Sequence, residues 1–200
     1  MPQTARAIRI GLIGGECTGK STLAADLSAA LRRCLRDGAG VEPRVVVVGE
    51  VLRTFVTEHQ RAPQVAEQAG IMAEQRLAEE QAEQIGDIVI ADPATMMTAV
   101  YSQLYFRDRS LWPQALHRAG DYALLLWCRP DLPWLADPGQ RDGPAFRQRA
   151  DRIIAGSQLA RSARQLRGDR RVRAEGAVMH AIAVLGATGV WREGEPGFRT

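Results

Sequence analysis

The sequence predicts an α/β fold in which helices cover both faces of a parallel sheet. Short apolar runs recur along the chain, helical patterns separate them, and a glycine-rich segment joins the first run to the first helix. Strands that alternate with helices form parallel sheets, because each parallel connection must cross over the sheet. The chain has 200 residues, which is enough for one such domain. We expect this domain to span residues 1–190 and a loose tail to span residues 191–200.

The first half of the chain alternates strand and helix patterns. Ile8–Ile13 is an apolar run that leads into glycines, as a first parallel strand does. Leucines at helical spacing follow residue 22, and Asp37 with the next glycine marks the end of that helix. Val45–Val48 consists of valines alone, which predicts a short buried strand. Residues 64–85 are rich in Ala, Glu and Gln and predict a long exposed helix.

The second half continues this alternation. Ile88–Ala91 predicts a third buried strand, which Asp92-Pro93 stops, and residues 96–106 predict the next helix. The apolar run at residues 122–128 predicts a fourth strand. A fifth strand is expected near Val172, although its apolar signal is weak.

The glycine-rich segment at residues 14–22 satisfies the phosphate-loop (P-loop) pattern G-x-x-x-x-G-K-[S/T]. In this setting, between a strand and a helix, backbone N–H groups and the positive helix end bind phosphate. The nucleotide-binding residues that we expect here are Gly14, Gly15, Glu16, Cys17, Thr18, Gly19, Lys20, Ser21 and Thr22.

Lys20 is the only lysine among 26 Lys and Arg residues. Its compact ammonium suits a tight loop better than the wider planar fork of arginine. We expect Lys20 to lie against the β- and γ-phosphates of ATP, and the Ser21 hydroxyl to be a ligand of Mg²⁺.

Two acids stand where a parallel sheet places its ligands, at the carboxyl ends of strands. Asp92 follows the third strand and is our second candidate ligand for Mg²⁺; its alternative role is to start the turn before Pro93. Glu50 follows the second strand and could take a proton from a substrate hydroxyl or hold a sugar. Its alternative is a surface ion pair with Arg53. Lys20, Asp92 and Glu50 are therefore candidate catalytic residues.

Ten arginines but only three aspartates lie between residues 141 and 173. Arginines on a mobile segment can close over a triphosphate and neutralise charge on the transferring phosphoryl group. Our candidates are Arg141 as a catalytic residue and Arg149 as a nucleotide ligand, whereas most of the other arginines fit a solvated helix. The predicted fold class is thus a P-loop NTPase three-layer sandwich with a parallel sheet and a kinase-like lid. Nucleic-acid binding ranks lower, because Phe146 is the only aromatic residue in this stretch.

The bulk composition narrows the class of protein. The chain is 46% hydrophobic and 24% charged, as in ordinary globular proteins. It lacks a run of apolar residues long enough to span a membrane, so we expect no membrane partner. Three cysteines without C-x-x-C spacing favour a reducing, cytoplasmic location and argue against a structural zinc site.

Four stretches resemble the ribosylnicotinamide kinase domain of NadR-type NAD-biosynthesis proteins and the wider NadR/Ttd14-like P-loop ATPases. They are residues 14–23, 50–53, 92–106, and 132–137 leading to Arg141. The resemblance implies transfer of the γ-phosphate of ATP to the 5′-hydroxyl of a nucleoside such as nicotinamide riboside. The family often has a second acid where this chain has Ala94, which implies a different substrate or a loss of kinase activity. The histidines stand alone, so the adenylyltransferase H-x-G-H motif is absent.

We therefore expect an ATP- and Mg²⁺-dependent small-molecule kinase that acts on a nucleoside. The alternative is a nucleotide-binding regulatory or switch ATPase without a small-molecule acceptor, which Ala94 favours slightly. The absence of an N-K-x-D motif, which would need a second lysine, counts against an ordinary GTPase. The sequence leaves open whether the protein forms a homo-oligomer.

Overall fold

The computed structural model describes residues 7–37, 39–135 and 143–193. The strands are β1 (Ile8–Ile13), β2 (Leu35–Arg36), β3 (Val45–Val48), β4 (Ile88–Ala91), β5 (Leu124–Cys128), β6 (Ala163–Leu166) and β7 (Arg192–Glu193). The α-helices are α1 (Lys20–Cys34), α2 (Val51–His59), α3 (Gln68–Glu83), α4 (Met97–Phe106), α5 (Trp112–Ala119), α6 (Pro144–Ala155), α7 (Leu159–Ser162) and α8 (Arg170–Ala187). A 3₁₀ turn, η1 (Val65–Glu67), leads into α3.

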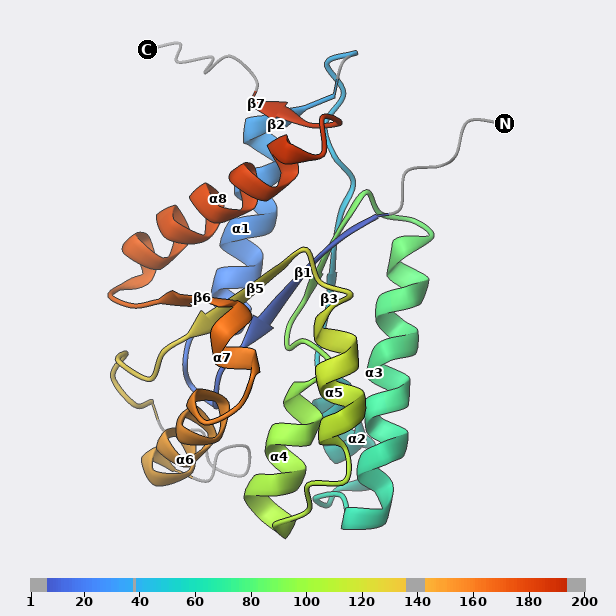
Figure 1. The fold of residues 1–200 in the computed structure, drawn as a ribbon, viewed down its shortest axis with the longest axis vertical. Coiled ribbons are helices and arrows are strands. Elements are labelled where there is room, and N and C mark those ends of the chain that lie inside the picture. Colours follow the sequence, from blue (N-terminus) through green and yellow to red (C-terminus); the bar gives the residue numbers. More distant parts are fainter. Residues whose placement is uncertain (1–6, 38, 136–142, 194–200) are drawn as a thin grey trace.

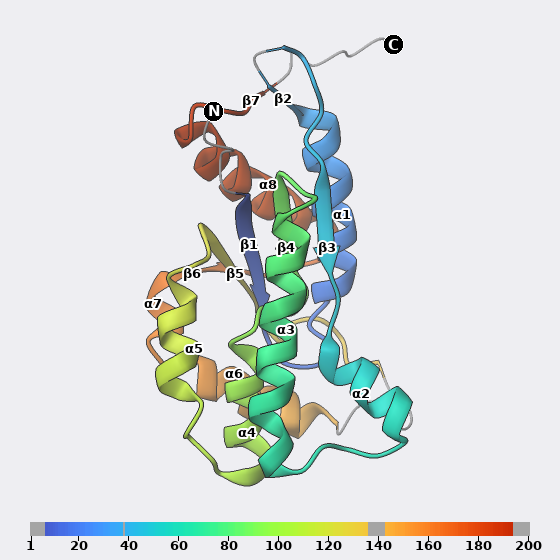
Figure 2. The same cartoon turned by 90° about the vertical axis from the view of Figure 1, so that its right-hand side faces the viewer.

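The main sheet is five-stranded and parallel throughout, in the order β3-β4-β1-β5-β6. β1 lies in the middle, with β4 on one side and β5 on the other (Figures 1 and 2; β4 is labelled in Figure 2). The chain thus builds one half of the sheet through β3 and β4 and then crosses to the other half at β5. In such sheets the crevice for ligands lies at this switch, beyond the carboxyl ends of the strands.

Helices cover both faces of the sheet and make three layers (Figures 1 and 2). On one face, leucines of α1 and small apolar residues of α8 pack on β1, β4 and β5 in one buried cluster. On the other face, α4 and α5 form a second cluster with Ala91, Trp127 and residues of α6. The predicted α/β sandwich is confirmed, with the strands at Ile8–Ile13, Val45–Val48 and Ile88–Ala91 at their predicted bounds.

The fifth strand lies elsewhere than predicted. Val172 belongs to α8, and the fifth strand is β6, which pairs with β5. β6 has the sequence ARQL, of which only Leu166 is buried, because β6 lies at the edge of the sheet. Asp169 caps α8 by accepting a hydrogen bond from the Val172 amide at 2.9 Å, so the segment that looked weakly apolar is a helix start.

Other element bounds also differ from the expected ones. The helix expected over residues 64–85 is α3 with η1 before it, and one of its faces is buried rather than exposed. α1 ends at Cys34 instead of near Asp37, because β2 begins there and pairs with β7. Trp191, the first residue of the expected loose tail, is buried in the core. No helix in the described ranges is both long and apolar enough to cross a membrane.

Candidate functional site

The loop between β1 and α1 has the backbone that its glycines predict. Gly14 and Gly19 have φ angles of 143° and 79°, in the region that favours glycine. A Cβ atom on Gly14 would lie 2.5 Å from the Cys128 carbonyl oxygen, which side chains do not tolerate. The Thr18 hydroxyl donates to the Gly15 carbonyl at 2.8 Å and closes the loop from within. The segment is therefore a P-loop that leads into the positive end of a helix.

Lys20 lies across this loop. Its Nζ donates hydrogen bonds to the carbonyl oxygens of Gly14 and Gly15, at 2.9 and 2.8 Å. Ser21 and Thr22, in the first turn of α1, are exposed. The ammonium and the Ser21 hydroxyl are thus both placed at the end of the sheet where a phosphate would meet the helix.

The two candidate acids lie next to each other at the ends of neighbouring strands. Glu50 precedes α2 directly after β3, and Asp92 follows β4, where its amide donates to the Val48 carbonyl at 2.8 Å. Burial raises the pKa of the Glu50 carboxyl; the charges of Lys20 and Arg53 lower this pKa, and that of Asp92 raises it. Because these charges act on one carboxyl, Lys20, Glu50 and Asp92 are brought together at one site. Arg53 Nη2 lies 3.8 Å from Glu50, so the surface ion pair also forms.

Tyrosines on α4 border the same site, which sequence reasoning missed. Burial raises the pKa of Tyr101 well above its usual value, and the charge of nearby Glu50 adds to this. One helical turn later, the Tyr105 hydroxyl lies 3.5 Å from a carboxylate oxygen of Glu16 in the P-loop. The Tyr105 ring stacks on Phe146 of α6, with centroids 5.6 Å apart. The spacing of the two tyrosines, four residues apart on a helix, is the signal that could have found them.

The arginine that contacts the P-loop is Arg147. Its Nη1 donates to the carbonyl oxygens of Cys17 at 3.2 Å and Leu132 at 2.8 Å. Its guanidinium also lies 5.4 Å from the centre of the Trp134 ring. The buried Arg147 therefore ties α6 to the P-loop and to the segment after β5.

The two arginines chosen from the sequence are placed differently. Arg149 is exposed on α6, with its guanidinium 5.4 Å from the Phe146 ring centre. Arg141 lies outside the described residues. Their assignment to a lid stays a prediction.

Arg173 of α8 is a second buried arginine at the P-loop, and sequence reasoning missed it. It donates to three backbone carbonyls, those of Thr18 at 2.6 Å, Arg129 at 2.8 Å and Gly168 at 2.8 Å. It also pairs with the Asp131 carboxylate. A single side chain thus joins the P-loop to the segments that follow β5 and β6. Arg173 lies four residues before Ala177, the first of the apolar residues that α8 buries at this spacing. This helical spacing was the signal in the sequence that Arg173 is buried.

We expect Arg173→Met to destabilise the protein by about 3 kcal/mol, because several carbonyl groups lose a charged donor at once. This loss corresponds to a fall in melting temperature of roughly 6–12 °C for a chain of this size. Thermal unfolding followed by circular dichroism measures it. Arg171→Met is the matched control: Arg171 is exposed on the same helix and pairs with Glu175, so its loss is expected to change stability by less than about 0.5 kcal/mol. Equal melting temperatures for the two variants would contradict the role of Arg173.

Comparison with known proteins agrees with this geometry. A family model described as an AAA domain matches residues 9–166. None of the curated proteins matches the chain. Among solved structures, a NadR protein in complex with NR has a TM-score of 0.61 at 18% identity, covering 96% of this chain and 54% of that chain. A NadR protein in complex with NAD and AMP-PNP has a TM-score of 0.60 at 19% identity, covering 92% and 50%.

A thymidylate kinase from Ehrlichia chaffeensis has a TM-score of 0.59 at 17% identity, covering 90% of this chain and 99% of that chain. The chain therefore spans about half the length of the NadR chains and nearly all of the thymidylate kinase. At these identities the likeness shows the fold, which is that of P-loop kinases. The family model runs from β1 to the end of β6 and includes the P-loop, so the chain belongs to the AAA domain family.

Proposed function

We propose that the protein is an ATP- and Mg²⁺-dependent kinase that phosphorylates a hydroxyl of a nucleoside. The observation that carries the proposal is the meeting of Lys20 in a formed P-loop with two acids, Glu50 and Asp92, at the ends of adjacent strands. A kinase needs both parts: a cradle for the phosphates of ATP, and a carboxylate that orients the acceptor hydroxyl.

Each residue has a distinct task in this proposal. Lys20 would place its ammonium against the β- and γ-phosphates, in place of the carbonyl groups that it contacts within the loop. Glu50 would accept the proton of the acceptor hydroxyl, for which a carboxyl of raised pKa is suited. Arg147 would keep the P-loop in shape, since its Nη1 donates to the Cys17 carbonyl, and Arg149 stays the exposed candidate for contact with phosphate.

The residues present fit a magnesium ion. Ser21 and the Asp92 carboxylate supply hard oxygen ligands at the carboxyl end of the sheet, which Mg²⁺ prefers. Within the described ranges, no group of three or more His, Cys, Asp or Glu side chains could hold a metal ion. The other ligands would accordingly be phosphate oxygens and water, and the ion would neutralise charge on the transferring group.

A nucleoside is the acceptor class that we propose, with nicotinamide riboside as the first compound to test. The fold is shared with a NadR protein whose structure contains NR, although that protein is less than 20% identical. The Tyr105 ring stacked on Phe146 near the P-loop also offers a flat apolar surface to a base.

Ala94 occupies the position where the resemblance implies an acid, and this was the observation that favoured a switch ATPase. Ala94 is 1% exposed and belongs to the buried cluster under α4. A Cβ atom on Gly11 would lie only 2.9 Å from the Ala94 methyl group, so this position is tightly packed. An acid here would be buried in apolar surroundings. In this chain the alanine therefore fits the core and gives the switch little support.

Incubation with MgATP and a panel of nucleosides, with ADP release as the readout, tests the proposal. We expect one nucleoside, with nicotinamide riboside in the panel, to stimulate ADP release at least about tenfold over the rate with MgATP alone. A slow rate that no nucleoside changes would contradict the kinase and favour the switch ATPase.

A further inference from the structure

Helix α3 buries polar side chains where an amphipathic helix usually buries apolar ones. Gln75 is 3% exposed and Glu79 is 0% exposed. The two residues are four positions apart, so they lie on the same face of the helix, one turn from each other. A buried amide or carboxylate costs free energy unless it is fully hydrogen-bonded, and apolar side chains would avoid this cost. The partners of these two groups therefore indicate what the helix does.

Gln75 holds the turn that carries Glu50. Its Oε1 accepts a hydrogen bond from the Val51 amide at 2.9 Å, and its Nε2 donates to the Gly49 carbonyl at 3.2 Å. Val51 is the first residue of α2, and its amide has no partner within its own helix. One side chain thus fixes the backbone on both sides of Glu50.

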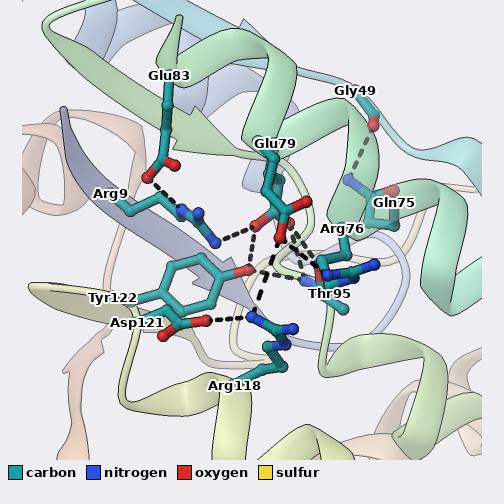
Figure 3. A network of polar contacts seen from close by, with 11 residues as sticks. Arg9, Gly49, Gln75, Arg76, Glu79, Glu83, Thr95, Arg118, Asp121 and Tyr122 are labelled. Carbon is teal, nitrogen blue, oxygen red and sulfur yellow. Dashed lines mark hydrogen bonds and ion pairs between the residues drawn. The ribbon is translucent and has the colours of Figure 1, made fainter. Parts of the chain in front are cut away.

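Glu79 holds the turn that follows Asp92. Its carboxylate accepts from the Thr95 amide at 3.1 Å and from the Thr95 hydroxyl at 2.8 Å. The Tyr122 hydroxyl donates to the other oxygen at 2.5 Å. Figure 3 shows these contacts converging on Glu79, with Arg9 approaching from the side of β1.

Arg9 compensates the buried charge. Its Nη1 lies 3.6 Å from Glu79, and its Nε donates to Glu83 at 2.8 Å. Burial raises the pKa of Glu79, while the hydrogen bonds from Tyr122 and Thr95 and the charge of Arg9 lower it. Burying the Glu79 carboxylate so deep in the fold costs free energy. Its contacts with the Thr95 turn explain why the chain has a carboxylate at this position.

We propose that α3 positions the acceptor side of the site: Gln75 and Glu79 act as two clamps, one turn apart, that set the separation of Glu50 and Asp92. The helix packs against β3, β4 and α2, the elements that carry both acids (Figure 2). Because the two clamps belong to one rigid helix, the two strand-end turns move together or remain fixed together. This inference rests on the proposed function in that it assigns Glu50 and Asp92 to the reaction.

Amide hydrogen exchange on the ¹⁵N-labelled full chain tests the clamps without any substrate. In Gln75→Leu we expect the Val51 amide to exchange roughly tenfold faster or more, because it loses its acceptor. The matched control is Gln81→Leu, the same change at an exposed position of α3, which is expected to leave the Val51 amide within twofold of the wild-type rate. Exchange of the buried Ile10 amide in β1 reports global opening, and the Val51 effect must exceed any change there.

The second clamp has its own variants. Glu79→Gln and Tyr122→Phe are each expected to speed exchange of the Thr95 amide severalfold. Tyr122→Phe removes a single hydroxyl and keeps the ring in the core, so it remains informative if Glu79→Gln folds poorly. Glu83→Gln is the control, because it removes a carboxylate from the same Arg9 side chain.

Kinetics separate positioning from a purely structural role. With the nucleoside that the wild type phosphorylates as substrate, Gln75→Leu is expected to lower kcat about tenfold. The KM for ATP should stay within about twofold, because the substitution does not touch the P-loop. Unchanged exchange at Val51, or kinetic constants equal to those of Gln81→Leu, would overturn the inference. If the wild-type chain phosphorylates no nucleoside, the proposed function fails, and the exchange rates still decide whether the clamps exist.

Discussion

Replacing Lys20 with alanine is expected to lower nucleoside-dependent ADP release by at least about a hundredfold, because the donor that we propose for the transferring phosphate is lost. Melting is expected to change little, by roughly 2–4 °C, since the ammonium contributes only two hydrogen bonds to loop carbonyls. Coupled-enzyme kinetics and thermal unfolding of the same preparation measure both quantities. Full turnover in the alanine variant would contradict the proposed role of the P-loop.

Two controls sharpen this test. Lys20→Arg keeps the charge but places a wider, planar group in the loop, so we expect it to remain at least about tenfold slower than the wild type. Lys20 is also the only side-chain amine. An amine-selective reagent should therefore modify one side chain, and MgATP should protect it. If MgATP does not reduce the labelling of Lys20, the nucleotide binds elsewhere.

The parts of the fold that could be predicted are those with an apolar signal of their own. β1, β3 and β4 are short apolar runs, and each is found at its predicted bounds. β6 could not be found in this way, because an edge strand buries few side chains and ARQL has no apolar alternation. The buried face of α3 was hidden for a related reason, since Gln75 and Glu79 look like surface residues in the sequence.

The same distinction applies to the site. Lys20, Glu50 and Asp92 could be chosen because a loop motif and the strand-end rule each refer to local sequence. The contacts of Arg147 and Arg173 with the P-loop could not be predicted, because their carbonyl partners there, Cys17 and Thr18, lie more than a hundred residues away in the chain. Contacts of a side chain with distant backbone leave no pattern in a single sequence.

Arginine and lysine have separate tasks in this chain. Arg147 and Arg173 each bind more than one backbone oxygen, as Arg173 does with three carbonyl groups, which suits the several donors of a guanidinium. A lysine in that position would have fewer donors in a less extended arrangement. The one lysine lies in the P-loop, where the proposed function requires a compact charge to approach phosphate. Thus the arginine-rich composition contributes to holding the P-loop as well as to charge at the surface.

Glu50→Gln is expected to lower kcat by about a hundredfold, the usual contribution of a general base. Burial raises the pKa of Glu50, so wild-type activity should fall with decreasing pH at a higher pH than an ordinary glutamate would give. This acidic limb should be missing from the residual activity of Glu50→Gln. Glu58→Gln, an exposed change on the same helix, is the control and should keep both the rate and the limb.

The raised pKa also predicts the sign of a change in stability. A carboxyl whose pKa is higher in the folded state keeps its proton at pH values where the unfolded chain has lost it. The contribution of this carboxyl to stability therefore falls as the pH rises from its pKa in the unfolded chain through its pKa in the folded protein. Above the raised pKa of Glu50, wild-type protein holds a partly buried charge that glutamine lacks. Glu50→Gln should therefore melt at a higher temperature than wild type at pH 7 to 8, and the two should converge near pH 4. A less stable variant at neutral pH would mean that the ion pair with Arg53 outweighs burial, and Glu50 would then be a structural residue that happens to lie beside the P-loop.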